Sequence, residues 1–320
     1  MTRAIGAGVL TVVCLGWADG GFGADVGRGF GSEFSVLATA RQAGTGGLAL
    51  EDPWRQGNFV EATSVVLSSG VRWLEFGAQG GAGAGLRIGA DGFAFTPTGI
   101  AGTSENADGT YAGETGDVKA SSWGAHLVGQ WTVADGGVWR AAVVGRATGV
   151  VQQLSVAQSV GVGADAGVQA QRATGKGEAM TFWCLAGPLG WGADRLFAAS
   201  VTAGAGWMSR FTGGLFCASE GCALGAEGEL LSDKLVHGGA GAVYWFGAPS
   251  AAGCTLSLRA GVREASGSAQ VTQPRAGIGM LWRSPRGWGL QFDYAIVPLG
   301  ELGYLHYATL AVRIAPPVEE

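Results

Sequence analysis

Charged residues, lysine above all, and long apolar runs are scarce in this sequence of 320 residues. Charged side chains make up 14% of it, where about 25% is usual in soluble domains. Only three of the 20 basic residues are lysines, Lys119, Lys176 and Lys234, and the chain has no basic cluster that would indicate nucleic-acid binding. No apolar run of about 18 residues follows the N-terminus, which excludes a helical membrane protein.

Catalytic signatures are missing as well. The sequence contains no G-x-S-x-G, no H-E-x-x-H and no phosphate-binding loop, so we expect neither enzymatic activity nor a cofactor. Gly-x-Gly runs such as residues 81–85 are expected by chance in a chain with 60 glycines, and they favour strand curvature over dinucleotide binding. His126, His237 and His306 lie far apart in the sequence, which makes a zinc site a poor alternative.

Glycine, apolar residues and aromatic residues are abundant instead. Glycine occupies 60 of the 320 positions, 47% of the residues are hydrophobic, and there are 12 Trp, 13 Phe and 5 Tyr. That much apolar surface can offset the entropy of ordering the chain, which excludes a disordered protein. The glycines follow no three-residue period, which excludes collagen. A β-rich chain remains.

Near the C-terminus, apolar residues alternate with small or polar ones at the two-residue period of a β-strand. One segment places on its apolar face Leu290, Phe292, Tyr294 and Ile296, and on the other Gln291, Asp293 and Ala295. A second segment sets Ala308, Leu310, Val312 and Ile314 against Thr309, Ala311 and Arg313. Strands of this kind suit a membrane barrel, in which one face meets lipid and the other meets water or a plug.

Segments long enough to cross a bilayer recur along the chain, since a tilted strand needs about 9–11 residues. They cover residues 62–79, 83–96, 118–133, 138–149, 154–171, 178–185, 195–207, 234–246, 253–264, 270–283, 286–297 and 303–314, and the first range has room for two strands. The sequence therefore predicts an all-β fold, a transmembrane antiparallel β-barrel of about 12–14 strands. Residues 97–117 and 208–233 have loop compositions, and we expect both to form long extracellular loops.

Aromatic residues fall mostly near the ends of these predicted strands, where they would form girdles at the two membrane interfaces. They are Trp73, Phe76, Phe93, Phe95, Trp123, Trp131, Trp139, Trp207, Tyr244, Trp245, Phe246, Trp282 and Trp288. The alternative is the core of a soluble sandwich, which the intervening glycines and alanines would leave underfilled.

The N-terminus indicates export. A short basic start at Arg3 precedes an apolar run that ends in Gly16-Trp17-Ala18, so we expect residues 1–18 to be a signal peptide, with Ala24 as a later cleavage option. The alternative is a buried N-terminal core segment. Export agrees with a disulfide between Cys217 and Cys222, which flank a predicted turn and would close an exposed loop in an oxidising compartment.

Two segments carry a resemblance to a known family. Residues 289–303, which read Gly-Leu-Gln-Phe-Asp-Tyr-Ala-Ile-Val-Pro-Leu-Gly-Glu-Leu-Gly, resemble the C-terminal hairpin of PorV/PorQ-type proteins, which are FadL-like outer-membrane barrels. Residues 40–49 are similar to the glycine motif near the mature N-terminus of that family. The matching positions, to which we assign structural roles, are Arg41, Gly44, Gly46, Gly47, Asn58, Asp293, Tyr294, Pro298, Gly300, Leu302, Gly303 and His306. The turn motif places Asp293 near a barrel rim.

The resemblance implies a division of the chain. Residues 25–60 would fold into the lumen as a plug, with an ordinary periplasmic leader as the alternative, followed by a barrel at 61–314 and a tail at 315–320. The predicted plug is denser in charge than most of the strand segments, with Arg28, Glu33, Arg41, Glu51, Asp52 and Arg55. Such charge suits a segment that faces a polar lumen.

The resemblance also implies a function, the uptake of hydrophobic small molecules such as long-chain fatty acids across the bacterial outer membrane. Its implied partners are outer-membrane lipid, a hydrophobic small-molecule ligand and, during biogenesis, the barrel assembly machinery; no nucleic acid is among them. Two alternatives stay open at this point, a PorV-like accessory or shuttle protein of a secretion system and a structural or adhesin-like surface barrel.

Overall fold

The computed structural model describes residues 39–45, 58–67, 72–83, 85–96, 101–105, 111–117, 120–154, 157–175, 177–192, 195–196, 200–212, 219–231, 236–247, 253–265, 271–298 and 303–314. The predicted signal peptide and the C-terminal tail lie outside these residues. The described residues form antiparallel strands and one short helix, α2 (Ala40–Gly44). None of their helices has the length and apolarity needed to cross a bilayer.

Most of the strands belong to one sheet. Its strands are β1 (Asn58–Leu67), β2 (Arg72–Gly83), β3 (Leu86–Thr96), β6 (Ala120–Asp135), β7 (Trp139–Leu154), β8 (Ala157–Gly175), β9 (Glu178–Gly192), β10 (Arg195–Leu196), β11 (Ser200–Thr212), β12 (Ser219–Leu231), β13 (Val236–Phe246), β14 (Gly253–Ala265), β15 (Val271–Arg283), β16 (Trp288–Pro298) and β17 (Tyr304–Ile314). A second, two-stranded sheet consists of β4 (Ala101–Glu105) and β5 (Tyr111–Asp117).

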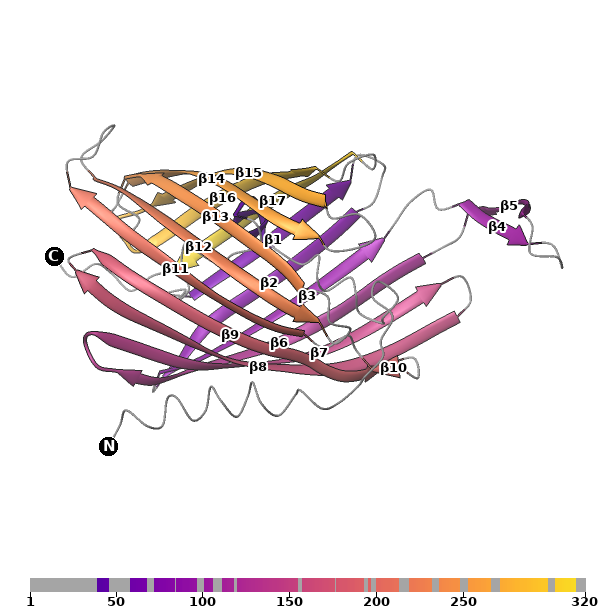
Figure 1. The fold of residues 1–320 in the computed structure, drawn as a ribbon, viewed down its shortest axis with the longest axis horizontal. Helices are drawn as coiled ribbons and strands as arrows, with labels where there is room; N and C mark the ends of the chain where they lie inside the picture. Colours follow the sequence, from indigo (N-terminus) through magenta and orange to yellow (C-terminus); the bar gives the residue numbers. More distant parts are fainter. Residues whose placement is uncertain are drawn as a thin grey trace.

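The large sheet closes into a barrel (Figure 1). Of its 15 strands in the described residues, β10 only extends the edge of β9, and the other fourteen form a ring because β9 pairs with both β8 and β11. The first and last strands complete this ring, with Asn58 opposite Ile314 and Leu67 opposite Leu305. The predicted antiparallel barrel is confirmed, and its strand number lies at the top of the predicted range.

Side chains alternate between the two faces of the wall, as the two-residue period predicts. On β16, Leu290 and Phe292 are exposed on the outside, whereas Gln291 and Asp293 are buried inside. Exposed apolar side chains continue around the ring, among them Val60, Leu74, Ile88, Leu127, Val143, Val162, Phe182, Leu224, Leu258, Ile278 and Leu310. An apolar exterior around a polar interior is the arrangement of a membrane barrel and the reverse of that in soluble proteins.

Some of the aromatic residues lie where the predicted girdles require them. Trp123, Trp131 and Trp139 are exposed on β6 and β7. Trp282 and Trp288 are exposed beside the turn between β15 and β16 and touch edge to face, with ring centroids 4.9 Å apart.

The girdle prediction is wrong for two other aromatic residues. Phe93 and Trp245 point into the lumen and are only 4% and 6% exposed. Each ring lies over a glycine of the neighbouring strand, Gly124 under Phe93 and Gly221 under Trp245, at a place where a Cβ would collide with the ring. Glycine therefore makes room for a large inward side chain. The girdle prediction used only the distance of each aromatic residue from a strand end, and that distance does not show which way the side chain points.

The prediction of a long loop at residues 208–233 is also wrong. Strand β11 continues to Thr212, and β12 spans Ser219–Leu231. Glu220 and Gly221, the expected turn of the cysteine pair, are strand residues opposite Phe246 and Trp245. Of the acidic residues that suggested a loop, Glu220, Glu227 and Glu229 lie in β12, and Asp233 lies outside the described residues. Arg263 of β14 forms ion pairs with Glu227 and Glu229.

The connections alternate between the two ends of the barrel. We call the end at which β1 begins and β17 finishes the terminal end. The turns 84–85, 136–138, 176–177 and 284–287 are at the terminal end, and connection 97–119, which carries β4 and β5, is at the opposite end. The connection 213–218 is at the terminal end too, so the two predicted long loops do not share one face. Figure 1 shows β4 and β5 standing away from the barrel wall.

The apolar exterior makes a direct prediction about stability in lipid. Leu258 lies near the middle of β14 and Leu230 near the end of β12, and both are 52% exposed. We expect Leu258→Arg to lower the free energy of unfolding by about 2–4 kcal/mol and Leu230→Arg by about 0–1 kcal/mol, because the cost of an arginine falls from the bilayer midplane to its interface. Urea-induced unfolding in liposomes measures both variants. Equal costs at the two positions would contradict a bilayer around this wall.

Candidate functional site in the barrel lumen

Helix α2 begins and ends with local hydrogen bonds that fix its short turn. The Thr39 side chain accepts a hydrogen bond from the backbone N–H of Gln42, and the Gln42 side chain accepts one from the N–H of Thr39 at 3.2 Å. This reciprocal pair is a capping box, which satisfies donors that a helix start leaves open. At the other end, the Thr45 hydroxyl donates to the Arg41 carbonyl at 3.1 Å. Hydrogen bonds within residues 39–45 thus hold the turn of α2.

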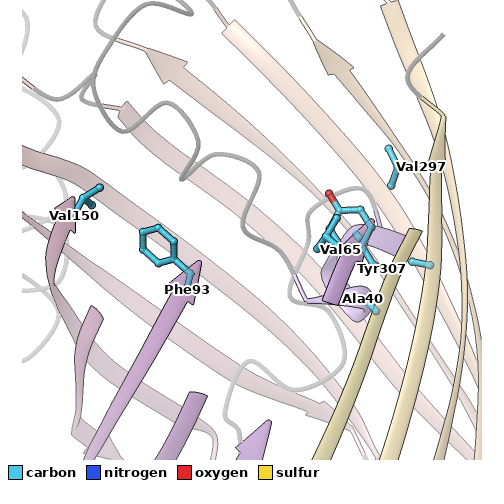
Figure 2. Close-up of a cluster of buried hydrophobic side chains, with 8 residues drawn as sticks. Ala40, Val65, Phe93, Val150, Val297 and Tyr307 are labelled. Carbon is cyan, nitrogen blue, oxygen red and sulfur yellow. The ribbon is translucent and has the colours of Figure 1, made fainter. Parts of the chain in front are cut away.

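The helix lies against the inner wall of the barrel, where it contacts β14, β15, β16 and β17. Ala40 and Ala43 are fully buried and pack in a cluster with Val65, Tyr307 and Ala295. Figure 2 shows Ala40 beside Val65 and Tyr307, while Phe93 and Val150 lie together on another part of the wall. Alanine at both contact positions lets the helix backbone approach the strands closely.

The wall fits the helix at both ends, through a hydrogen bond at one and a glycine at the other. The Ala40 N–H donates to the Thr309 hydroxyl at 2.9 Å, and Thr309 is also within 2.9 Å of the Thr63 hydroxyl. At the C-terminal end, the carbonyl of Thr45 lies over Gly241 of β13, where a Cβ would collide with it. The wall is therefore shaped to receive the backbone of α2.

A buried ion network joins α2 to three strands. Arg41 donates to Glu61 of β1 at 2.8 Å and lies 3.8 Å from Asp293 of β16. Asp293, which is fully buried, also accepts hydrogen bonds from Arg259 of β14 at 2.8 Å and from Gln291 at 2.7 Å. Positive and negative groups alternate through this network, and each buried charge has a partner, which is the condition for keeping charges in a low-dielectric interior.

A glycine between two strands allows the Arg259–Asp293 contact. The two residues lie on β14 and β16, which are separated by β15, where Gly277 stands opposite Arg259 and Gly279 stands opposite Asp293. A Cβ on Gly279 would collide with both the carboxylate of Asp293 and the guanidinium of Arg259. The absence of a side chain at Gly279 therefore makes room for an ion pair that spans a whole strand.

A second charged cluster follows the same principle on β9, β12 and β14. Arg263 donates to Glu227 at 3.1 Å and to Glu229 at 2.9 Å, and the Trp183 indole N–H donates to Glu227 at 3.3 Å. Gly204 separates Trp183 from Glu227 in the cross-strand register, and Gly239 separates Glu227 from Arg263. Here too, glycines let long side chains reach each other along the wall.

A third polar cluster lies on β3, β6 and β7. The His126 Nδ1 and the Thr148 hydroxyl are 2.8 Å apart, and the His126 Nε2 is 3.7 Å from Asp91. In the neighbouring pair, Arg146 donates to Asp165 at 2.5 Å. In the described residues, no group of three His, Cys, Asp or Glu side chains is arranged to hold a metal ion. The lumen is thus lined by paired charges and hydrogen-bonded polar groups.

Two of the residues that carry the family resemblance meet in this lumen. Arg41 and Asp293, from the two separate motifs, form part of the same ion network. The expected place of Asp293 near a barrel rim is wrong, because it lies in the middle of β16 and points inward. Its inward direction follows from the alternation of β16, whereas the turn motif that suggested a rim begins only at Pro298.

The other resemblance residues lie elsewhere. Tyr294 and His306 form a pair across β16 and β17, with 2.6 Å between the Tyr294 hydroxyl and the His306 Nδ1. Gly44 ends α2, Asn58 begins β1, Pro298 ends β16, and Gly303 precedes β17 with a φ of 90°. Outside the described residues are Gly46, Gly47, Gly300, Leu302 and Cys217. Because Cys217 is among them, the Cys217–Cys222 disulfide stays a prediction; Cys222 itself lies in β12.

Sequence reasoning did not single out Arg259 and Arg263. A usable signal was present, since both arginines occupy luminal positions of a strand whose outward positions include Leu256 and Leu258. A charged residue on the small or polar face of a predicted barrel strand points to the lumen. Their partners, however, depend on the register between neighbouring strands, and the sequence of a single strand does not determine that register.

The comparisons with known proteins concern the fold. No protein family matches the sequence, and no curated protein does either. Among solved structures, the barrel is similar to the toluene transporter TodX of P. putida, with a TM-score of 0.56 and 8% identity over 88% of this chain and 99% of that one. Two further similar structures are a FadL homologue of Pseudomonas aeruginosa (TM-score 0.48, 10% identity, 87% of this chain and 98% of that one) and CdiB of Acinetobacter baumannii (TM-score 0.48, 11% identity, 81% of this chain). The match spans 60% of the CdiB chain.

The likeness to TodX defines a class of fold. At 8% identity, the TM-score of 0.56 shows that the two chains share a fold.

Proposed function

We propose that this protein is an outer-membrane channel for the uptake of hydrophobic small molecules, with long-chain fatty acids as the expected substrates. The observation that carries the proposal is a closed membrane barrel whose lumen holds a helix fastened by specific polar contacts. The fold likeness to TodX, described as a toluene transporter, supports the same function. The family resemblance of the two terminal motifs points in the same direction.

The lengths of the connections support an orientation in the bacterial outer membrane. Barrels of that membrane have short turns on the periplasmic side and longer loops outside. The terminal end carries turns as short as 84–85 and 176–177, and the opposite end carries the connection 97–119. Gly85 and Gly177 have φ values of 76° and 79°, as two-residue hairpin turns require. We therefore place the terminal end in the periplasm.

In this proposal, α2 belongs to a plug that controls passage through the lumen. Residues 39–45 pack on the wall through the Ala40 and Ala43 contacts and the Arg41 ion pairs. The remainder of the predicted plug, apart from residues 58–60, lies outside the described residues, and β1 begins at Asn58 inside its predicted range. The ion pairs around Arg41 would hold the plug in place without a covalent bond. A substrate could then pass once these residues exchange their polar partners.

Uptake by cells tests the proposal. The chain would be produced in a Gram-negative host that lacks its own fatty-acid channel, and uptake of radiolabelled hexadecanoate would be compared with that of a disaccharide. We expect hexadecanoate uptake to rise several-fold over cells with an empty vector and disaccharide uptake to stay unchanged. A folded barrel in the outer membrane that raises neither, or raises only the disaccharide, would refute the proposed function.

A further inference from the structure

Arg172 is a charged residue on the outer face of the barrel wall. It is exposed near the end of β8, and it lies an even number of residues along the strand from Val160 and Val162, which are exposed on the outside. Its register neighbours are Trp139 of β7 and Met180 of β9, and both are exposed on the same face. Arg172 thus stands among apolar side chains on the surface that meets lipid.

The position of Arg172 along β8 indicates the depth of the membrane interface. Every residue of 133–139 and of 172–175 is exposed, so at the terminal end the β6–β7 and β8–β9 hairpins are open on both faces of the wall. Trp139 on β7 and Arg172 on β8 stand opposite each other where this exposure begins. Tryptophan favours the membrane–water interface, and a long arginine side chain can reach the headgroups from there. The pair therefore lies at headgroup depth.

The guanidinium of Arg172 contacts a ring and faces no carboxylate. Its Cζ lies 5.5 Å from the centre of the Trp139 ring, which is a cation–π contact. In the part of the chain that the structure describes, Arg172 forms no ion pair. Glu178, an acidic residue of the same hairpin, has its carboxylate over Gly175, where a Cβ would lie 3.2 Å from it. Because a guanidinium has five N–H donors, Arg172 can still bind an anion.

We propose that Arg172 and Trp139 bind the phosphate of a glycerophospholipid headgroup on the outside of the barrel. The planar guanidinium can donate two parallel hydrogen bonds to phosphate oxygens. Met180 and Phe182 of β9 continue the exposed apolar surface from the level of Arg172 toward the middle of the wall, where the acyl chains would lie.

The orientation of the barrel selects the lipid. We place the terminal end in the periplasm, and the leaflet of the bacterial outer membrane on that side consists of phospholipid. Phospholipid is therefore the expected occupant of a phosphate site at this end. The site goes beyond uptake through the lumen, since it shares with the proposed function only the orientation of the barrel.

Binding of a phospholipid and of its diacylglycerol tests the proposal. The full-length protein would be purified in a non-ionic detergent and titrated with dioleoylphosphatidylglycerol or with dioleoylglycerol, which has the same acyl chains and no phosphate. Native mass spectrometry counts the bound lipid. We expect the phospholipid to bind at least about fivefold more tightly, as one arginine at an anionic lipid surface would produce. Arg172→Gln should remove this preference and leave the binding of diacylglycerol unchanged.

Two further variants complete the experiment. Arg286→Gln makes the same change at another exposed arginine of the terminal end, in the turn between β15 and β16, and should keep the preference. Trp139→Leu keeps an apolar side chain and removes the ring beside the guanidinium, so it should lower the affinity for the phospholipid only in part. Heat-dependent electrophoretic mobility shows whether each variant is a folded barrel.

Three results would overturn the proposal. The wild type could show no preference, or Arg172→Gln could keep it. Arg286→Gln could lose as much as Arg172→Gln, which would make surface charge in general responsible. Lipid A, the phosphorylated lipid of the outer leaflet, is titrated in parallel, and a larger loss of lipid A than of phospholipid in Arg172→Gln would show that the phospholipid assignment is wrong. Hexadecanoate uptake is measured separately, so the proposed function can fail or hold whatever the lipid preference.

Discussion

Asp293→Asn is expected to lower the free energy of unfolding by about 3 kcal/mol, although it removes a single charge. Asp293 is fully buried and accepts hydrogen bonds from Arg259 and Gln291, with Arg41 at 3.8 Å. Removing one partner of a buried ion pair leaves the other charge uncompensated in a low-dielectric interior, at a cost of about 3–5 kcal/mol. We place the asparagine variant at the lower limit because its amide oxygen can still accept one hydrogen bond. Urea-induced unfolding followed by tryptophan fluorescence measures the change.

The chain offers a matched control for this prediction. Asp135 pairs with Arg140 at 2.9 Å, close to the 2.8 Å of the Arg259–Asp293 pair, but its side chain is 56% exposed. Exposed pairs contribute about 0–1 kcal/mol because water already solvates both charges. Asp135→Asn should therefore cost little under the same conditions. Similar costs for the two variants would show that burial of Asp293 is not what makes its network important.

The barrel was predictable because each strand reports its own two faces. Over residues 290–296 of β16 and 308–314 of β17, apolar residues alternate with small or polar ones, so the strands, their direction of exposure and their membrane setting follow from local sequence. The same reasoning failed at β12. Glu227 and Glu229 form ion pairs with Arg263, two strands away along the luminal wall, and in a single sequence window they looked like loop residues.

The ion network was harder to predict because it depends on the alignment of several strands. Arg259 reaches Asp293 across β15 because Gly279, which stands opposite Asp293, has no side chain to collide with the guanidinium. The alternation of residues within β14, β15 or β16 does not predict this contact between two strands. The family resemblance selected Arg41 and Asp293 separately, but their meeting in the lumen follows from closure of the barrel around α2. Gly279 and Gly241 are thus needed at their own positions. Because glycine is abundant throughout the chain, the sequence alone does not distinguish these two from the others.

Gly241→Val should increase the ion conductance of the barrel several-fold, because it removes the place where α2 rests. The Thr45 carbonyl lies over Gly241, and any Cβ at this position would collide with that backbone. The helix must then move away from the wall and break its contacts at Ala40 and Arg41. A helix with its side chains is about 10–12 Å across, so its departure would open much of the lumen. Single-channel recording in planar bilayers measures the change.

Gly238 provides the control on the same strand, since a Cβ there would have no neighbour within 4 Å. Gly238→Val should fold and conduct like the wild type. Arg41→Met provides a second way to release the helix, since it leaves the wall unchanged and removes the ion pairs with Glu61 and Asp293. Heat-dependent electrophoretic mobility establishes that each variant is a folded barrel. If folded Gly241→Val and Arg41→Met both conduct like the wild type, α2 does not close the lumen, and control of passage by a plug fastened at Arg41 has to be abandoned.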